Sequence, residues 1–184
     1  EELKTTFPWL FIPETKVFTD ANLIHLKKYV ANLLTEKNYS QIKTILTWFA
    51  KKITNGKVDF NCYEHDCFLY MIQLSQTNTL LASKAYSVIN SILTTSHDRD
   101  TLLSKLMDIS DDVDLKFSNT ILQIWHYYVI SNNCNAKVIG ELVNRLCSIN
   151  DNPIILSELV VTGKNNNKKL FAYIKNAYSS LSNN

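Results

Sequence analysis

Only three glycines occur among the 184 residues of this chain, and Gly56, Gly140 and Gly163 lie far apart. Average usage near 7% corresponds to about thirteen glycines in a chain of this length. Loops that hold phosphates and turns that present a nucleophile need several glycines close together, because only glycine lets the backbone approach a ligand or turn that sharply. The scarcity therefore excludes GxGxxG, Walker-type and GxSxG sites, and it disfavours all-β folds, which depend on glycine-rich turns.

Apolar residues recur at helical spacing in eight or nine segments of the chain. The segment 39–54 shows this most clearly, because its apolar residues fall on one face and leave Lys43, Thr47 and Lys51 on the other. Similar stripes run through residues 20–36, 61–75, 78–92, 97–107, 116–131, 135–146, 152–162 and 167–181. Thr19 and Gly56 mark a helix start and a helix stop, and Asn61 with Glu64 is a candidate capping pair. Strand signals are poor, since the apolar runs 7–12 and 154–161 have no hairpin partner. The sequence predicts an all-α fold.

Connections between the predicted helices are only a few residues long, so successive helices are expected to pack as antiparallel neighbours. Alternate helices begin near residues 20, 61, 97 and 135, which gives spacings of 41, 36 and 38 residues. Helix-pair repeats of the HEAT or armadillo (ARM) kind run at about 40 to 47 residues. The spacing resembles a short HEAT-like stack. A non-repeating helical bundle gives comparable spacings and is the alternative.

The densest aromatic stretch is FPWLFIP at residues 7–13, and its two prolines argue against a helix. We expect residues 1–18 to form an extended N-terminal arm that lies over the core of a single α-helical domain, residues 19–184. The alternative is that Phe7, Trp9 and Phe11 anchor another protein, since aromatic residues are enriched at binding hot spots. Because the chain begins with Glu rather than Met, we expect it to be part of a larger protein, and a processed form is the alternative.

Charge is distributed unevenly, with a net +4 over residues 1–57, −6 over 58–115 and +4 over 116–184. Lysine neutralises phosphate well, but arginine is the usual reader of base edges, and the chain has only two arginines. Its pI near 8.3 also falls short of a strongly basic nucleic-acid-binding domain. The candidate interaction surface combines the aromatic residues of the arm with the lysine clusters: Phe7, Trp9, Phe11, Lys27, Lys28, Lys51, Lys52, Lys164, Lys168 and Lys169.

Side chains that carry chemistry form no recognisable site in the sequence. Cys62, His65 and Cys67 lie within six residues, but a structural zinc site needs a fourth ligand, which no second pair supplies. The four histidines fall in four different predicted helices, and no nucleophile stands beside a base. The acidic stretch 108–114 lacks the glycine and glutamate of a calcium loop. We therefore expect no enzymatic activity, no cofactor and no metal.

The four cysteines follow no secretory signal segment, so we expect reduced thiols and an intracellular location, cytoplasmic or nuclear. No apolar run approaches the roughly 18 residues of a membrane span. The sequence predicts a non-catalytic protein–protein interaction domain, a scaffold or adaptor within a protein complex. Its helical face or groove would hold a partner helix or peptide. The alternative is a helical nucleic-acid-associated domain that contacts phosphates weakly through its lysine clusters.

Overall fold

The computed structural model describes residues 2–98 and 101–102. The chain divides into two compact units, residues 1–97 and 98–184, and almost all described residues belong to the first. The helices predicted beyond residue 102 lie outside the described residues, as do Lys164, Lys168 and Lys169. The predicted single domain of residues 19–184 runs across this division and stays a prediction.

Helices make up most of the described part of the chain, which confirms the all-α prediction there. The elements follow in the order α1 (Glu2–Thr6), the 3-10 helix η1 (Pro8–Leu10), β1 (Lys16–Val17), α2 (Asp20–Thr35), α3 (Tyr39–Thr54), β2 (Val58–Asp59), α4 (Glu64–Thr77) and α5 (Ala82–Thr95). No helix within residues 2–98 and 101–102 combines the length and the apolar character needed to cross a membrane. The predicted total of eight or nine helices concerns the whole chain and stays a prediction.

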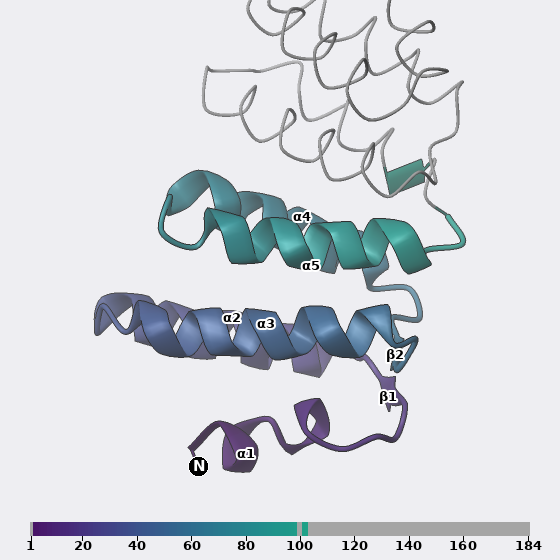
Figure 1. Cartoon of the computed structure of the whole chain (residues 1–184), viewed down its shortest axis with the longest axis horizontal. Coiled ribbons are helices and arrows are strands. Elements are labelled where there is room, and N and C mark those ends of the chain that lie inside the picture. The colour runs from purple at the N-terminus through teal and green to yellow at the C-terminus, as the bar shows by residue number, and fades with distance from the viewer. Residues whose placement is uncertain (1, 99–100, 103–184) are drawn as a thin grey trace, which may run out of the picture. The chain divides into compact units, whose positions relative to one another are not determined.

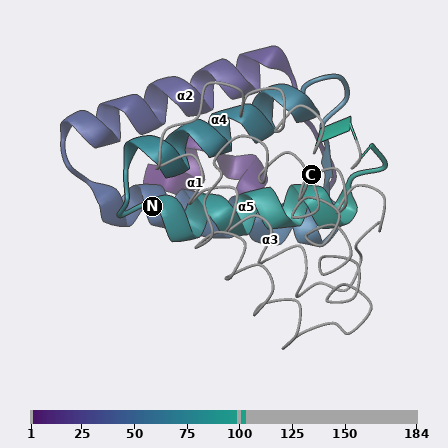
Figure 2. The same cartoon turned by 90° about the horizontal axis from the view of Figure 1, so that it is seen from above.

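The four long helices form two antiparallel pairs, one above the other (Figure 1). One layer consists of α2 and α3, and the next consists of α4 and α5. Seen from above, α2 and α4 lie on one side, and α3 and α5 lie on the other (Figure 2). Helix α5 packs against both α3 and α4, and it thereby connects the two layers.

Helix α2 begins as its sequence predicts. The hydroxyl of Thr19 accepts a hydrogen bond from the amide of Asn22 over 3.3 Å. In return, the side-chain carbonyl of Asn22 accepts one from the amide of Thr19 over 2.9 Å. This reciprocal capping box satisfies two amides that the first helical turn leaves without a backbone partner.

Both helices of the first layer end in a left-handed residue. At the end of α2, Lys37 has φ 58°, and the next amide, that of Asn38, donates back to the carbonyl of Leu33 over 2.8 Å. At the end of α3, Gly56 has φ 71° and the next amide makes the equivalent bond over 3.1 Å. These are Schellman ends. The predicted helix stop at Gly56 is confirmed.

The start of α4 differs from the prediction that Asn61 and Glu64 form a capping pair. The helix begins at Glu64, and Tyr63 precedes it without a side-chain cap. Asn61 instead has φ 55°, and its amide donates to the side-chain carboxylate of Asp59 over 3.0 Å. Asp59 closes a local turn of the kind that Asx residues favour, and Asn tolerates the left-handed conformation that follows. That turn removes Asn61 from the capping position.

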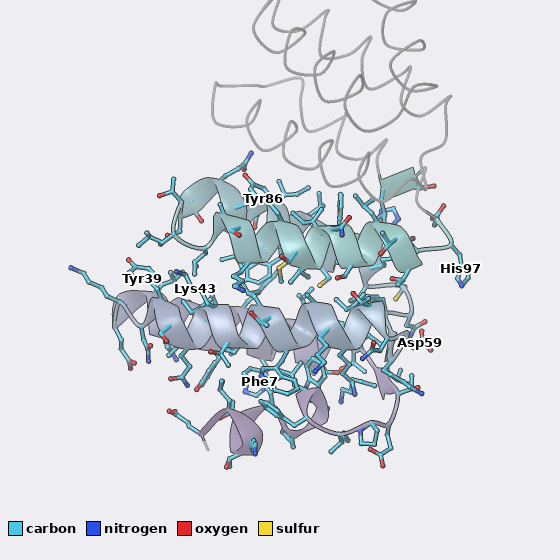
Figure 3. All side chains as sticks on the ribbon, in the orientation of Figure 1. Phe7, Tyr39, Lys43, Asp59, Tyr86 and His97 are labelled. Atoms are coloured by element: carbon cyan, nitrogen blue, oxygen red, sulfur yellow. The ribbon has the colours of Figure 1, made fainter. Side chains whose placement is uncertain are left out.

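The N-terminal arm packs against the core, but it is not extended throughout. Residues 2–6 form α1, and Pro8 begins the 3-10 helix at a position where the missing amide of proline costs no hydrogen bond. Phe7 is only 1% exposed, and it lies between the arm and the helices (Figure 3). Trp9 is also buried, with its ring in edge-on contact with those of Phe18 and Phe49.

Two short strands join the arm to the connection between α3 and α4. β1 pairs with β2 in parallel, with Lys16 opposite Val58. The amide of Phe18 donates to the carbonyl of Asp59 over 2.7 Å. Fully buried Phe18 then packs against Phe49 and Phe60 at centroid distances of 5.8 and 5.6 Å. The arm is therefore held both by backbone pairing and by an aromatic core.

Candidate interaction surface

The structure does not bring the described residues of the predicted interaction surface together. Lys27 and Lys28 are exposed on α2, whereas Lys51 is exposed on α3, on the other side of the helix pairs (Figure 2). Phe7 and Trp9 are buried in this chain's own core, and Phe11 is half-buried. Among the described residues of this predicted surface, Phe11 of the arm and Lys51 of α3 do come close, since both adjoin the ring of Trp48.

Lys52 is buried rather than available to phosphate, with 5% of its surface exposed. Its ammonium group donates hydrogen bonds to the backbone carbonyls of Ile12 over 2.8 Å and of Glu14 over 2.7 Å. Burial lowers the pKa of Lys52 below its ordinary value. The prediction that Lys52 belongs to a surface cluster with Lys51 is corrected: successive residues of a helix point in directions about 100° apart, and Lys52 turns inward.

The most distinctive surface feature is Trp48, which is 36% exposed on the outer face of α3. A hollow of about 450 Å³ lies on one side of it, lined by Ser40, Lys43, Thr44, Thr47, Trp48 and Lys84. A smaller hollow of about 220 Å³ lies on the other side, lined by Leu10, Phe11, Ile12, Pro13, Trp48, Lys51, Lys52, Asn55 and Lys57. We call these two hollows and the tryptophan between them the Trp48 groove.

The larger hollow is lined mainly by the polar face of α3, on which Figure 3 labels Lys43. The hydroxyls of Thr44 and Thr47 donate to the carbonyls of Ser40 and Lys43, one turn earlier, over 3.0 and 2.7 Å. These hydroxyl hydrogens are therefore committed to the helix itself. Lys84, near the start of α5, completes the lining because α5 packs on α3.

Trp48 is held between an aromatic ring and a cation. The ring of Phe11 lies 5.0 Å from it, centroid to centroid, and the Lys51 ammonium lies 5.0 Å from its centroid. Ile12, which is 47% exposed, extends the apolar surface along the arm. A cation above a tryptophan face is favourable and orients both side chains. The ring thus presents its remaining surface in a fixed position.

The residues lining the Trp48 groove include five lysines and no carboxylate. With Lys52 committed to the arm, the exposed or half-buried lysines are Lys43, Lys51, Lys57 and Lys84. Like charges gathered along a hollow create a positive potential that attracts an oppositely charged partner. The groove is therefore a basic surface with an apolar centre.

Sequence reasoning identified Phe11, Lys51 and Lys52 but missed the other residues that line this surface. The signal for Lys43 and Thr47 was present, because both lie opposite the apolar stripe of residues 39–54. Trp48 was not identified because it is next to Phe49, an aromatic residue that does belong to the apolar stripe. Lys84 lies 36 positions from Trp48, and only the packing of α5 on α3 brings it to the groove.

Among the residues that the structure describes, no histidine, cysteine or carboxylate lines the two hollows of the Trp48 groove. Within residues 2–98 and 101–102, no three metal-ligating side chains gather. Cys62 is exposed and Cys67 is buried, and burial raises the pKa of the Cys67 thiol well above its usual range. Comparison with protein-family models, curated proteins and solved structures gives no match.

Proposed function

We propose that this chain is a non-catalytic protein–protein interaction domain, a scaffold or adaptor that holds a partner protein in the Trp48 groove. The observation that carries this proposal is an exposed tryptophan between two hollows whose polar rim is basic. Tryptophan is enriched at the few positions that dominate binding energy, where neighbouring residues exclude water from it. An exposed apolar patch with a polar rim also marks interaction sites in general.

The helix pairs support a HEAT-like stack as the architecture behind this surface. Helices α2 and α4 begin at residues 20 and 64, and α3 and α5 begin at 39 and 82, so corresponding helices are offset by 44 and 43 residues. Both offsets fall within the 40 to 47 residues of HEAT and armadillo repeats. Stacked repeats create extended binding surfaces from corresponding helices, here α3 and α5. A non-repeating bundle is the alternative.

The second candidate is a nucleic-acid-associated domain. The groove lysines could contact phosphates, and the face of Trp48 could stack on a base. Single-strand binding sites, however, usually stack successive bases on several aromatic side chains. In the Trp48 groove only Phe11 accompanies the tryptophan, and Phe11 is half-buried against it. A protein partner therefore accounts better for this surface.

An intracellular location, cytoplasmic or nuclear, belongs to the same proposal. Cys62 and Cys67 are both free thiols in the described part of the chain, as is usual in reducing compartments. We also propose that the domain works within a larger protein or complex, because a scaffold acts by bringing other components together.

Affinity purification from native cell extract tests the proposed function. The variant Trp48→Ala/Lys43→Glu alters the groove, and Lys27→Glu/Lys28→Glu is the matched control on α2. We expect the wild type and the control to recover the same proteins after nuclease treatment, and the groove variant to lose them. Partner proteins that bind all three forms equally would contradict the proposal. Partners lost from all three on nuclease treatment would favour the nucleic-acid alternative.

A further inference from the structure

We propose that the Trp48 groove takes an acidic peptide segment with one large apolar residue between its carboxylates. This inference rests on the proposed function and names the chemistry of the partner. It follows from three features of the groove: the size of the smaller hollow, the spacing of the lysines, and the absence of free hydroxyl donors on the threonines that line the larger hollow.

The smaller hollow fits a single side chain. Its volume of about 220 Å³ lies below the roughly 300–1,000 Å³ of small-molecule sites. Its walls are mainly apolar and come from the arm, with Trp48 opposite: Leu10, Phe11, Ile12 and Pro13. Placing one large apolar side chain there would bury exposed surface of both Ile12 and Trp48. Burial of apolar surface is the main favourable term in association.

The lysines are spread along the groove rather than gathered at one point. Lys43 and Lys51 are eight residues apart on α3, which is about 12 Å along a helix. Lys84 lines the larger hollow and Lys57 the smaller one. A single phosphate is held best by donors that converge on it, whereas separated ammonium groups match separated carboxylates. Charged groups are thus available on both sides of the apolar anchor.

The polar groups on the floor of the groove favour a partner that accepts hydrogen bonds. Thr44 and Thr47 already use their hydroxyl hydrogens on the helix backbone. The lysine ammonium groups are the charged donors of the groove, beside the neutral donors of Ser40 and Asn55. Carboxylates are acceptor-only groups and form strong charge-assisted bonds with ammonium donors. Aspartate and glutamate side chains are therefore the expected neighbours of the anchor residue.

Selection from a display library of random short peptides tests this inference, because such a library has no bias in charge. The whole 184-residue chain is the target, at about 0.15 M salt. We expect enrichment of Asp and Glu on both sides of a Leu, Phe or Trp. A selected peptide, synthesised with a fluorescent label, should bind Trp48→Ala and Lys43→Glu/Lys84→Glu at least about tenfold more weakly. The control Lys27→Glu/Lys28→Glu should stay within about twofold.

The outcomes separate this inference from the proposed function. Neutral or basic peptides that depend on Trp48 would overturn the acidic partner and leave the interaction surface in place. Peptides that bind Trp48→Ala as well as wild type, with far-UV circular dichroism unchanged, would overturn both. A library that yields no binder overturns the peptide inference, while affinity purification still tests the function. Tight binding of a poly-dT oligonucleotide, lost in the same lysine variant, would overturn it in favour of nucleic acid.

Discussion

The ammonium group of Lys52 donates a hydrogen bond to the backbone carbonyl of Glu14 over 2.7 Å, and this contact joins α3 to the N-terminal arm. A second bond, to the carbonyl of Ile12, anchors the same ammonium over 2.8 Å. The residues just before these carbonyls form the apolar wall of the smaller hollow beside Trp48. Lys52 therefore positions the wall of the groove from inside the protein, although it is not expected to touch a partner.

Replacing Lys52 by methionine should lower the free energy of unfolding by about 1–2 kcal/mol. Hydrogen bonds from charged groups contribute about 1.5–3 kcal/mol, but Ile12 and Glu14 are exposed, so water can partly replace the lost donors. Urea denaturation of the two forms measures the difference. Lys28→Met, an exposed control on α2, should stay within about 0.5 kcal/mol of wild type. Equal changes in the free energy of unfolding for Lys52→Met and Lys28→Met would show that the two hydrogen bonds of Lys52 do not stabilise the fold.

The same lysine predicts a pH dependence. Burial lowers the pKa of folded Lys52 below its ordinary value of 10.5, so the unfolded chain binds this proton more tightly than the folded one. The contribution of Lys52 to stability should therefore increase as the pH rises toward 10.5. Subtracting the unfolding free energy of Lys52→Met from that of wild type at each pH isolates this contribution. A difference that shrinks with rising pH would contradict the buried position of the ammonium group.

Phe49 and Trp48 are neighbours in the sequence, but replacing them should cost different amounts of stability. Phe49 is buried against Trp9, Phe18 and Phe60, so Phe49→Ala should cost about 3–5 kcal/mol of stability. Trp48→Ala removes a partly exposed ring and should cost less than about 1.5 kcal/mol. Chemical denaturation compares the two directly. A larger loss of stability for Trp48→Ala than for Phe49→Ala would contradict this arrangement, because it would mean that the face of α3 with Trp48 faces the core.

The two left-handed helix ends should respond in opposite directions. Lys37→Gly relieves a lysine with φ 58°, and it should stabilise the fold by about 0.5–1 kcal/mol. Gly56→Ala should cost about 1 kcal/mol, and this cost comes from the backbone alone, since nothing lies within 4 Å of the added methyl group. Thermal and urea unfolding measure both. A stabilising Gly56→Ala would mean that the end of α3 is not left-handed.

Helices were predictable because their signals are local. The apolar stripe of residues 39–54, the Thr19 start and the Gly56 stop all belong to the segment that they describe. The arm was predictable only in part. Two prolines correctly limit long helices, but Pro8 can begin a 3-10 helix, and the two-residue strands β1 and β2 are too short to leave a periodic pattern.

The interaction surface was less predictable because it depends on which side of a helix faces the core. Lys51 and Lys52 are consecutive residues of the same type, so the sequence does not distinguish their environments. In the structure Lys51 lies over the Trp48 ring, whereas Lys52 is buried against the arm. The groove also combines residues from the arm, α3 and α5. These residues come together only through tertiary packing, which cannot be predicted from the pattern of any single segment.

Site-specific photo-crosslinking tests the central claim most directly. A benzophenone amino acid at Thr44 places the reactive group in the larger hollow of the Trp48 groove, and the same group at Lys28 on α2 is the control. The proposed function predicts crosslinking of one protein partner from position 44, abolished by Trp48→Ala, and none from position 28. Crosslinking of the partner from position 28 and not from position 44 would contradict the assignment of this surface.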